Sequence, residues 1–179
     1  ISGQLFRTRT ITPENIDGTG GVATLRAPTK EDGLAVHRLI GDCPPLDENS
    51  LYCNLLQCEH FAATTVVAEQ RGELVGCISA YLIPDRPDTV FVWQVAVGSA
   101  ARGQGLALRM LNAIVDRPAC AAVHYLETSI TPDNTASWGM FQKFADGRDA
   151  ELTANAWFDR DLHFGGAHDS ERLVRIGPF

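Results

Sequence analysis

The chain lacks the cysteine patterns of a zinc site or of a disulfide framework. Its five cysteines include no Cys-x-x-Cys pair and no Cys/His spacing of the zinc type, and their number is odd. No apolar run approaches the roughly 18 residues of a membrane-spanning helix, and residues 1–20 contain no hydrophobic segment of the signal-peptide kind. We therefore expect reduced thiols, no metal, no membrane association and a cytoplasmic location.

Positive charge is also scarce. The 15 Lys and Arg residues against 22 Asp and Glu residues give a net charge of −7. This balance argues against a nucleic-acid-binding surface and weakly favours a cationic ligand, although the same charge also serves solubility. A chain of 179 residues with 45% hydrophobic residues is long enough for one globular domain and short for two. We expect a flexible lead-in over residues 1–21 and one domain over residues 22–179.

The periodicity of the sequence alternates between strands and helices. Strands are expected at 22–27, 64–68, 74–82, 90–97, 123–130 and 173–176, and helices starting near 29 and 50 and over 106–115 and 134–145. Antiparallel strands come first and a β–α–β–α unit follows. This order predicts an α/β or α+β three-layer domain, with a mixed, mostly antiparallel sheet and helices on both faces.

Three finer expectations concern side chains and loops. In the second helix, Leu51, Leu55 and Leu56 are expected to face the core. Alternate residues of the strand at 90–97 are expected to share one face: Phe91, Trp93, Val95 and Val97. The segment 146–170 has weak periodicity and is interpreted as a loop that folds over a site.

A glycine-rich turn at residues 102–107 lies between an apolar strand and an amphipathic helix. Unpaired N–H groups and the positive dipole end of a helix can hold a diphosphate there, and glycine removes the Cβ atoms that would keep the oxygens away. The alternative is an ordinary tight turn. No GxGxxG with a following acidic residue and no GxxxxGK[ST] occurs, so neither a Rossmann site nor a P-loop is expected.

With Arg102, Gly105 and Ala107 in place, the turn resembles motif A of the GNAT acyltransferase superfamily, [R/Q]-x-x-G-x-[G/A]. This resemblance implies acetyl-CoA as co-substrate, held at its diphosphate by the turn: Arg102, Gly103, Gln104, Gly105, Leu106 and Ala107. It also implies that the pantetheine arm pairs with the main chain of the preceding strand: Gln94, Val95, Ala96 and Val97. Asn134 and Ser137 would contact the same arm, although Asn134 is equally suited to cap a helix.

The chain departs from the common pattern of that superfamily at two catalytic positions. Phe141 stands where many members have the tyrosine that protonates the departing thiolate. The segment 92–94 has no glutamate where many members have the base that deprotonates the amine. Acid and base must therefore come from elsewhere, or the reaction depends on the proximity of a bound, neutral amine.

Four separated segments resemble the family of L-2,4-diaminobutyrate acetyltransferases of ectoine biosynthesis. They are Pro44–Tyr52, Phe91–Val97, Leu126–Asn134 and the stretch from Gly165 to Phe179. The resemblance implies acetyl transfer from acetyl-CoA to the γ-amine of L-2,4-diaminobutyrate, and a homodimer. The alternatives are a GNAT enzyme acting on another small diamine or polyamine, and a non-catalytic acyl-CoA sensor.

Two residues near the second helix are candidates for the acceptor site. A diamine needs carboxylates for its ammonium groups and a wall that excludes water. Asp47 is the first choice for an amine contact, with helix capping as the alternative. Tyr52 could supply the missing acid, or be a buried core residue.

The other candidates lie on strands and on a late loop. Trp93 could wall the site or make a cation–π contact, or be ordinary core. His168 and Asp169 lie in a glycine-flanked loop, which favours a substrate clamp. Relatives often have an acidic residue where this chain has Ala167, so the resemblance does not identify the residue that makes one of the amine contacts. Glu127 and Thr128 are weaker candidates for substrate contact.

Overall fold

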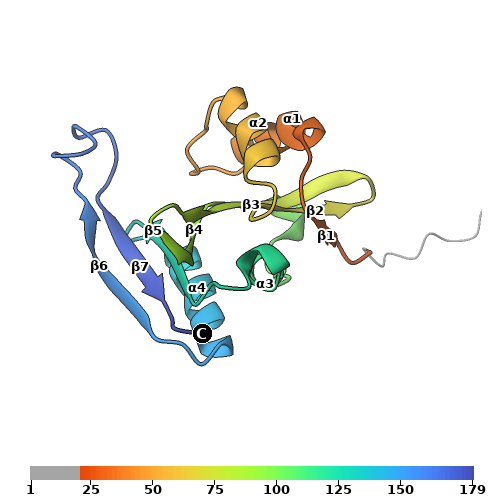
Figure 1. Cartoon of the computed structure of the whole chain (residues 1–179). Helices are drawn as coiled ribbons and strands as arrows, with labels where there is room; N and C mark the ends of the chain where they lie inside the picture. Colours follow the sequence, from red (N-terminus) through yellow and green to blue (C-terminus); the bar gives the residue numbers. More distant parts are fainter. Residues whose placement is uncertain (1–20) are drawn as a thin grey trace, which may run out of the picture.

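Strand order defines the architecture. The computed structural model describes residues 21–179, and within them seven strands form one sheet in the order β1-β2-β3-β4-β5-β7-β6 (Figure 1). The strands are β1 (Thr24–Arg26), β2 (Val66–Gln70), β3 (Glu73–Ile83), β4 (Arg86–Val97), β5 (Tyr125–Ile130), β6 (Leu152–Phe158) and β7 (Glu171–Ile176). Only β4 and β5 are parallel among the pairs of this sheet.

Helices cover both faces of the sheet, as the sequence predicted. The helices are α1 (Gly33–Gly41), α2 (Leu51–His60), α3 (Leu106–Val115) and α4 (Thr135–Gly147), with 3-10 turns η1 (Lys30–Asp32), η2 (Ser99–Ala101) and η3 (Pro118–Cys120). Figure 1 shows α1 and α2 on one side of the sheet and α3 and α4 on the other. The larger core lies on the α3 and α4 side and includes Met110, Ile114 and Phe144. The three-layer α/β prediction is confirmed.

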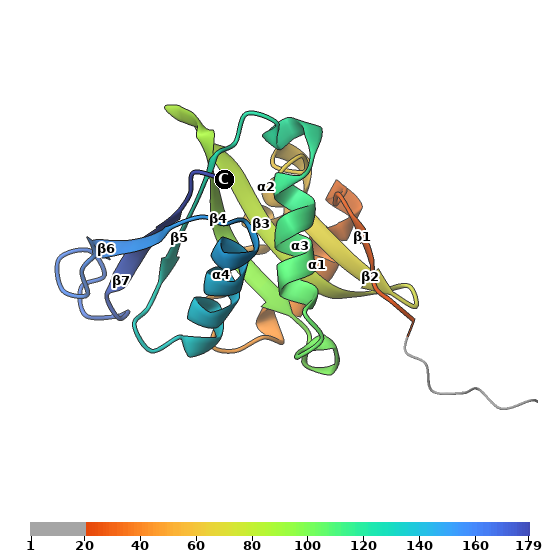
Figure 2. The same cartoon turned by 90° about the horizontal axis from the view of Figure 1, so that it is seen from below.

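The parallel pairing of β4 with β5 is short. It joins Thr89–Val92 to Tyr125–Thr128, whereas the antiparallel pairing of β4 with β3 continues to Val97. Figure 2 shows β5 turning away from β4 beyond the paired segment. The edge of β4 from residue 93 to residue 97 therefore has no strand partner on that side within residues 21–179, and an extended ligand can add to it through main-chain hydrogen bonds.

A β-bulge overturns the predicted common face of the β4 side chains. Ser79 pairs with Gln94 while Ala80 pairs with Val92, so Trp93 is the extra residue. Phe91 and Trp93 accordingly lie near the ring of Tyr81, at 5.4 Å and 6.3 Å between centroids. The later alternate residues, Val95 and Val97, pack against the core on the α3 side. The bulge therefore shifts the alternation of the side chains, so that Phe91 and Trp93 lie on the α2 side of the sheet while Val95 and Val97 lie on the α3 side.

The buried face of α2 also differs from the prediction. Leu51 is 39% exposed, and the residues that are buried in this helix are Asn54, Gln57 and Cys58. Asn54 places Oδ1 3.0 Å from Nδ1 of His37 and donates from Nδ2 to Gln57 at 3.0 Å. Polar residues can occupy an inner face when they form hydrogen bonds with one another, although Nε2 of Gln57 has no partner among residues 21–179. The apolar pattern alone could not reveal this face.

The segment 146–170 is more ordered than the loop interpretation allowed. It holds the end of α4 and all of β6, which is an edge strand of the sheet. Only residues 148–151, between α4 and β6, and residues 159–170, between β6 and β7, remain as loops. The strand expected at 90–97 also begins earlier, at Arg86, which pairs with Ile83 in the β3–β4 ladder. The predicted lead-in over residues 1–21 lies outside the described residues, except for Gly21.

Candidate active site

The turn between β4 and α3 presents main chain and little else. Gly103 and Gly105 have φ values of +74° and +71°, and an added Cβ would meet no atom within 4 Å at either position. Gly105 is the N-cap of α3 and provides no side-chain cap. Arg102 and Gln104 fold back onto main-chain oxygens, Nε to Val97 at 2.9 Å and Nε2 to Ala100 at 3.0 Å. The first N–H groups of α3 thus face open space, which suits a bound diphosphate.

A groove continues from this turn along α3. Its volume is about 630 Å³, and its lining residues are Leu25, Gln104, Gly105, Leu108, Arg109, Asn112, Ala113 and Asp116. Leu106 starts the helix and is buried, whereas Ala107 is only partly buried. The size is in the range of small-molecule sites. Gln104 and Gly105 belong to the turn and also line the groove, so the two form one continuous surface.

Asn134 caps α4 and still has a free donor group. Its Oδ1 accepts a hydrogen bond from the N–H of Ser137 at 3.1 Å, so the capping interpretation describes its carbonyl oxygen. Its NH2 group is a separate donor and has no hydrogen-bond partner among residues 21–179. Both interpretations of Asn134 are therefore compatible with the structure.

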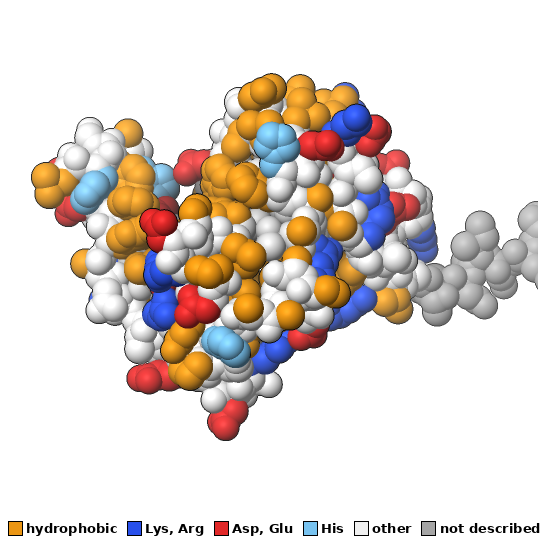
Figure 3. Space-filling model, in the orientation of Figure 1, with side chains coloured by type: hydrophobic (Ala, Val, Ile, Leu, Met, Phe, Trp, Pro, Cys, Tyr) orange, Lys and Arg blue, Asp and Glu red, His pale blue; other side chains and the backbone are white. Residues whose placement is uncertain are grey.

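Asp47, His168 and Glu171 come together from distant parts of the chain. Nε2 of His168 lies 3.5 Å from Oδ2 of Asp47 and 4.0 Å from Oε1 of Glu171. Nδ1 lies 2.7 Å from the carbonyl oxygen of Asp169. Asp47 comes from the α1–α2 loop, and the others come from the β6–β7 loop and the start of β7. Figure 3 shows a notch between these two parts, with acidic, histidine and hydrophobic side chains on its walls.

Glu171 is the functional candidate that sequence reasoning missed. Its side chain faces the predicted clamp residue His168 three positions earlier, and it is only 20% exposed. An acidic residue at the start of the last strand was the available signal, but nothing local tells which way a strand residue points. With Asp47 it supplies two carboxylates around one imidazole, an arrangement that can bind ammonium groups.

A series of contacts between aromatic rings connects β4 to His168. Trp93 is 43% exposed and meets Tyr81 edge to face, and Phe91 lies 5.7 Å from Trp157. Trp93 is thus not ordinary core and is free to form a wall. Tyr52 is 70% exposed on the first turn of α2, so the alternative of a buried core tyrosine is wrong.

Glu127 and Thr128 are engaged within the protein. Glu127 is buried and accepts hydrogen bonds from Arg86 at 2.6 and 2.8 Å and from Arg175. Burial alone would raise the pKa of this carboxyl, but the hydrogen bonds from the two arginines outweigh it and lower the pKa. Thr128 donates to the carbonyl oxygen of Val92 at 3.0 Å. Both residues lie at the point where β4 and β5 separate.

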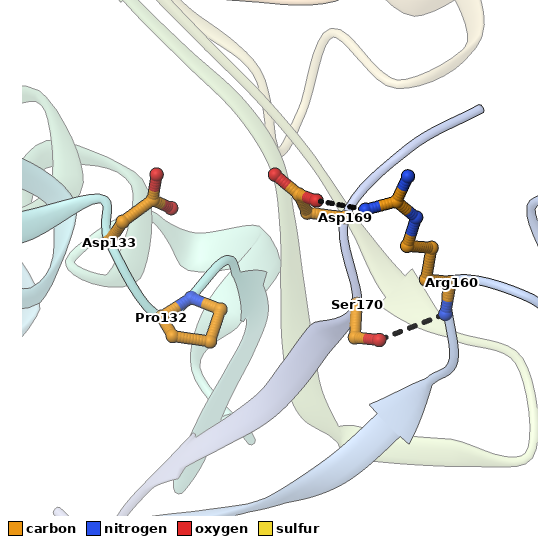
Figure 4. Close-up of a pocket in the computed structure, with 5 residues that line it drawn as sticks. All are labelled: Pro132, Asp133, Arg160, Asp169 and Ser170. Carbon is orange, nitrogen blue, oxygen red and sulfur yellow. Dashed lines mark hydrogen bonds and ion pairs between the residues drawn. The ribbon is translucent and has the colours of Figure 1, made fainter. Parts of the chain in front are cut away.

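A second hollow adjoins the β6–β7 loop. It has a volume of about 320 Å³ and is lined by Pro132, Asp133, Arg160, Asp169 and Ser170 (Figure 4). Oδ1 of Asp169 lies 3.6 Å from Nη1 of Arg160. The main-chain N–H of Arg160 donates to Oγ of Ser170. The structure therefore gives Asp169 a partner other than His168, although the two residues are adjacent.

Metal-binding clusters and membrane-spanning helices are both absent from residues 21–179. No group of three or more His, Cys, Asp or Glu side chains is arranged to hold a metal ion there. Among the same residues, no helix has the length and apolar character needed to cross a membrane.

Comparison with known proteins gives concordant matches. The acetyltransferase (GNAT) family profile matches residues 34–145. The L-2,4-diaminobutyric acid acetyltransferase of Methylotuvimicrobium alcaliphilum is 54% identical over 158 residues, which are 88% of this chain and 92% of that protein. The corresponding protein of Halomonas elongata is 50% identical over 156 residues, 87% of this chain and 81% of its own length.

A solved structure matches at the level of the whole fold. It is the diaminobutyrate acetyltransferase EctA from Paenibacillus lautus, in complex with L-2,4-diaminobutyric acid and coenzyme A. The TM-score is 0.85 at 39% identity, and the match covers 88% of this chain and 96% of that chain. The chain belongs to the GNAT acetyltransferase family and, within it, to the L-2,4-diaminobutyric acid acetyltransferases.

Proposed function

We propose that this protein transfers the acetyl group of acetyl-CoA to the γ-amine of L-2,4-diaminobutyrate, which gives N4-acetyl-L-2,4-diaminobutyrate. The main support for an amine-binding site is the group of Asp47, His168 and Glu171, in which two carboxylates surround one imidazole. A series of aromatic contacts connects this group to Trp93 on β4. Relatives at 54% and 50% identity bear the name of this activity, and the related structure holds both diaminobutyric acid and coenzyme A.

The donor side rests on main-chain groups. The glycine turn, with Arg102 beside it, fits the diphosphate of coenzyme A, and the free edge of β4 over residues 94–97 fits the pantetheine arm. The NH2 group of Asn134 is a further donor toward that arm, and Ser137 lies one turn later on α4. Acetyl-CoA supplies an acetyl group activated as a thioester.

The acceptor must lose a proton before it can react. A γ-ammonium held between Asp47 and Glu171 has His168 within reach as a proton acceptor, and Trp93 covers the approach from β4. The neutral amine then forms the C–N bond as the thioester C–S bond breaks, its nitrogen releases one further proton to give the neutral amide, and the departing thiolate takes up one proton. Tyr52 is the candidate donor of that proton, because Phe141 at the usual position is buried core.

The cellular setting follows from the product. N4-acetyl-diaminobutyrate is the precursor that a separate enzyme cyclises to ectoine, so a role in osmotic stress is proposed with it. Acetyl-CoA is made and used in the cytoplasm, and the five free cysteines suit a reducing compartment. We propose that location for the protein, and a single acetyltransferase domain over residues 22–179.

A homodimer is proposed as the assembly. Large apolar side chains are exposed on α2, on β6 and on the β6–β7 loop, among them Leu51 at 39%, Trp157 at 37% and Leu162 at 82%. β6 is also an unpaired edge of the sheet within the described residues. An exposed edge with apolar neighbours is suited to pairing with a second copy, and light scattering of the purified protein measures whether it does.

The activity is tested by the release of coenzyme A from acetyl-CoA with a panel of amines. We expect turnover with diaminobutyrate to exceed turnover with ornithine, lysine and spermidine, and NMR of the product to show acetylation at the γ-nitrogen. Equal rates across the panel would point to a general diamine acetyltransferase. Tight coenzyme A binding without turnover on any amine would refute an enzymatic role.

A further inference from the structure

Gln94 has a side chain that the coenzyme site does not use. The pantetheine arm is expected to bind the main chain of this strand, where side chains matter little. At the bulge, Gln94 pairs across the ladder with Ser79, so its side chain lies on the α1 and α2 side of the sheet. Because the Gln94 side chain lies on that side of the sheet, we expect it to have a role other than coenzyme binding.

Both ends of the Gln94 amide bind the α1–α2 loop. Its Oε1 accepts a hydrogen bond from Nδ2 of Asn49 at 2.7 Å, and its Nε2 donates to the main-chain oxygen of Asp47 at 2.6 Å. Both distances are short for hydrogen bonds of this type. One side chain therefore holds two points of the loop, and it uses the donor and the acceptor of its amide at the same time.

The loop needs this support at Asp47 in particular. The Asp47 side chain is 79% exposed, and within residues 21–179 its one ion-pair partner is His168, at 3.5 Å. A carboxylate so exposed is not placed by packing, and its position depends on its own main chain. That main chain is fixed to β4 at the carbonyl oxygen by Gln94.

We propose that Gln94 is a positioning residue that locks the acceptor loop to the donor strand. Its main chain belongs to the edge that receives the pantetheine arm, and its side chain sets the place of Asp47 in the acceptor site. The two substrates are thereby held at a fixed distance by one residue, as an acyl transfer between them requires. The inference rests on the proposed function for the identity of the acceptor.

Two substitutions separate this role from a role in coenzyme binding. Gln94→Leu removes both hydrogen bonds, and Asn49→Ala removes one of them from the exposed loop without touching β4. We expect KM for diaminobutyrate to rise about tenfold or more in Gln94→Leu and about threefold in Asn49→Ala, since a typical intramolecular hydrogen bond has a modest net effect. KM for acetyl-CoA and calorimetric coenzyme A affinity should stay within twofold of wild type in both.

The double variant Gln94→Leu/Asn49→Ala tests whether the residues act together. Its KM for diaminobutyrate should equal that of Gln94→Leu, because the partner of Asn49 is already absent. Gln142→Ala serves as the matched control, because Gln142 is an exposed glutamine of α4 whose side chain donates to Asp146, and it should leave both KM values unchanged.

Two results would overturn the inference. One is a KM for diaminobutyrate within twofold of wild type in both single variants. The other is a KM for acetyl-CoA that rises as much as that for the amine, which would make Gln94 part of the coenzyme site. Wild-type enzyme that acetylates a different amine refutes the proposed function instead, and the same variants are then compared on that amine.

Discussion

At the scale of single residues, the acceptor site depends on side chains that meet only after folding. Asp47 was expected in the site because a diamine needs a carboxylate for its ammonium group, and His168 because it lies in a glycine-flanked loop, where functional side chains are common. Their contact at 3.5 Å is a property of the fold. Glu171 has no local signal of this kind, because its role is visible only once β7 places it beside His168.

His168→Ala is expected to separate catalysis from donor binding. We predict a fall in kcat/KM for diaminobutyrate of about 10²-fold or more, the usual contribution of a general acid–base group. Coenzyme A affinity, measured by calorimetry, should not change, because no part of the glycine turn touches His168. Loss of coenzyme A binding together with turnover would show that the clamp assignment is wrong.

Glu171→Gln tests the carboxylate that the sequence did not reveal. The substitution keeps the size of the side chain and removes its charge, so the second ammonium contact is weakened. We expect KM for diaminobutyrate to rise by about tenfold, in the range of a hydrogen bond to a charged group. Glu73→Gln, at the exposed start of β3, is the control, and an equal effect of both substitutions would contradict the assignment.

At the scale of elements, the sequence predicted best what is local. The boundaries of α3 match those expected, and the glycine turn before it has the positive φ values that only glycine adopts freely. The predicted common face of the β4 side chains was wrong, because the bulge depends on how β3 pairs with β4. The predicted inner face of α2 was also wrong, because Asn54 forms a hydrogen bond with His37 on another helix. Non-local partners override local pattern in both elements.

Gly105→Glu is expected to abolish coenzyme A binding. The new side chain would bring a carboxylate to the place of the diphosphate, and it would strain a residue with φ of +71°. Gly72→Glu is the matched control, because Gly72 has φ of +81°, has no atom within 4 Å of an added Cβ and lies in the distant β2–β3 turn. Both variants should melt at a lower temperature, and only Gly105→Glu should lose binding in calorimetry. Retention of binding by Gly105→Glu would contradict the donor site.

At the scale of the whole molecule, one buried carboxylate joins the parts of the sheet that separate to form the site. Glu127 on β5 is held by Arg86 of β4 and by Arg175 of β7. The sheet must open beyond Val92 to admit the pantetheine arm, and this ion pair network holds it closed just before that point. No periodicity in the sequence indicates the network, since its members lie on three strands.

Because of this network, we expect the free energy of unfolding to decrease as the pH becomes acidic. The hydrogen bonds of the two arginines outweigh burial and lower the pKa of Glu127 below its ordinary value. A carboxyl with a lowered pKa in the folded state contributes stability that is complete above its unfolded pKa of about 4.3 and is lost as the pH falls through the folded value. In Glu127→Gln that contribution is absent at every pH.

We therefore expect Glu127→Gln to reduce the free energy of unfolding by about 1–3 kcal/mol at neutral pH, the cost of leaving buried donors without their charged partner. The difference from wild type should shrink steadily as the pH falls below about 4. Urea unfolding followed by circular dichroism between neutral pH and pH 3 measures both quantities. Asp116→Asn, whose carboxylate is 63% exposed beside Arg148, should change the free energy of unfolding by less than about 1 kcal/mol. A difference for Glu127→Gln that stays constant with pH would mean that packing, and not the charge of the carboxylate, stabilises the junction of β4, β5 and β7.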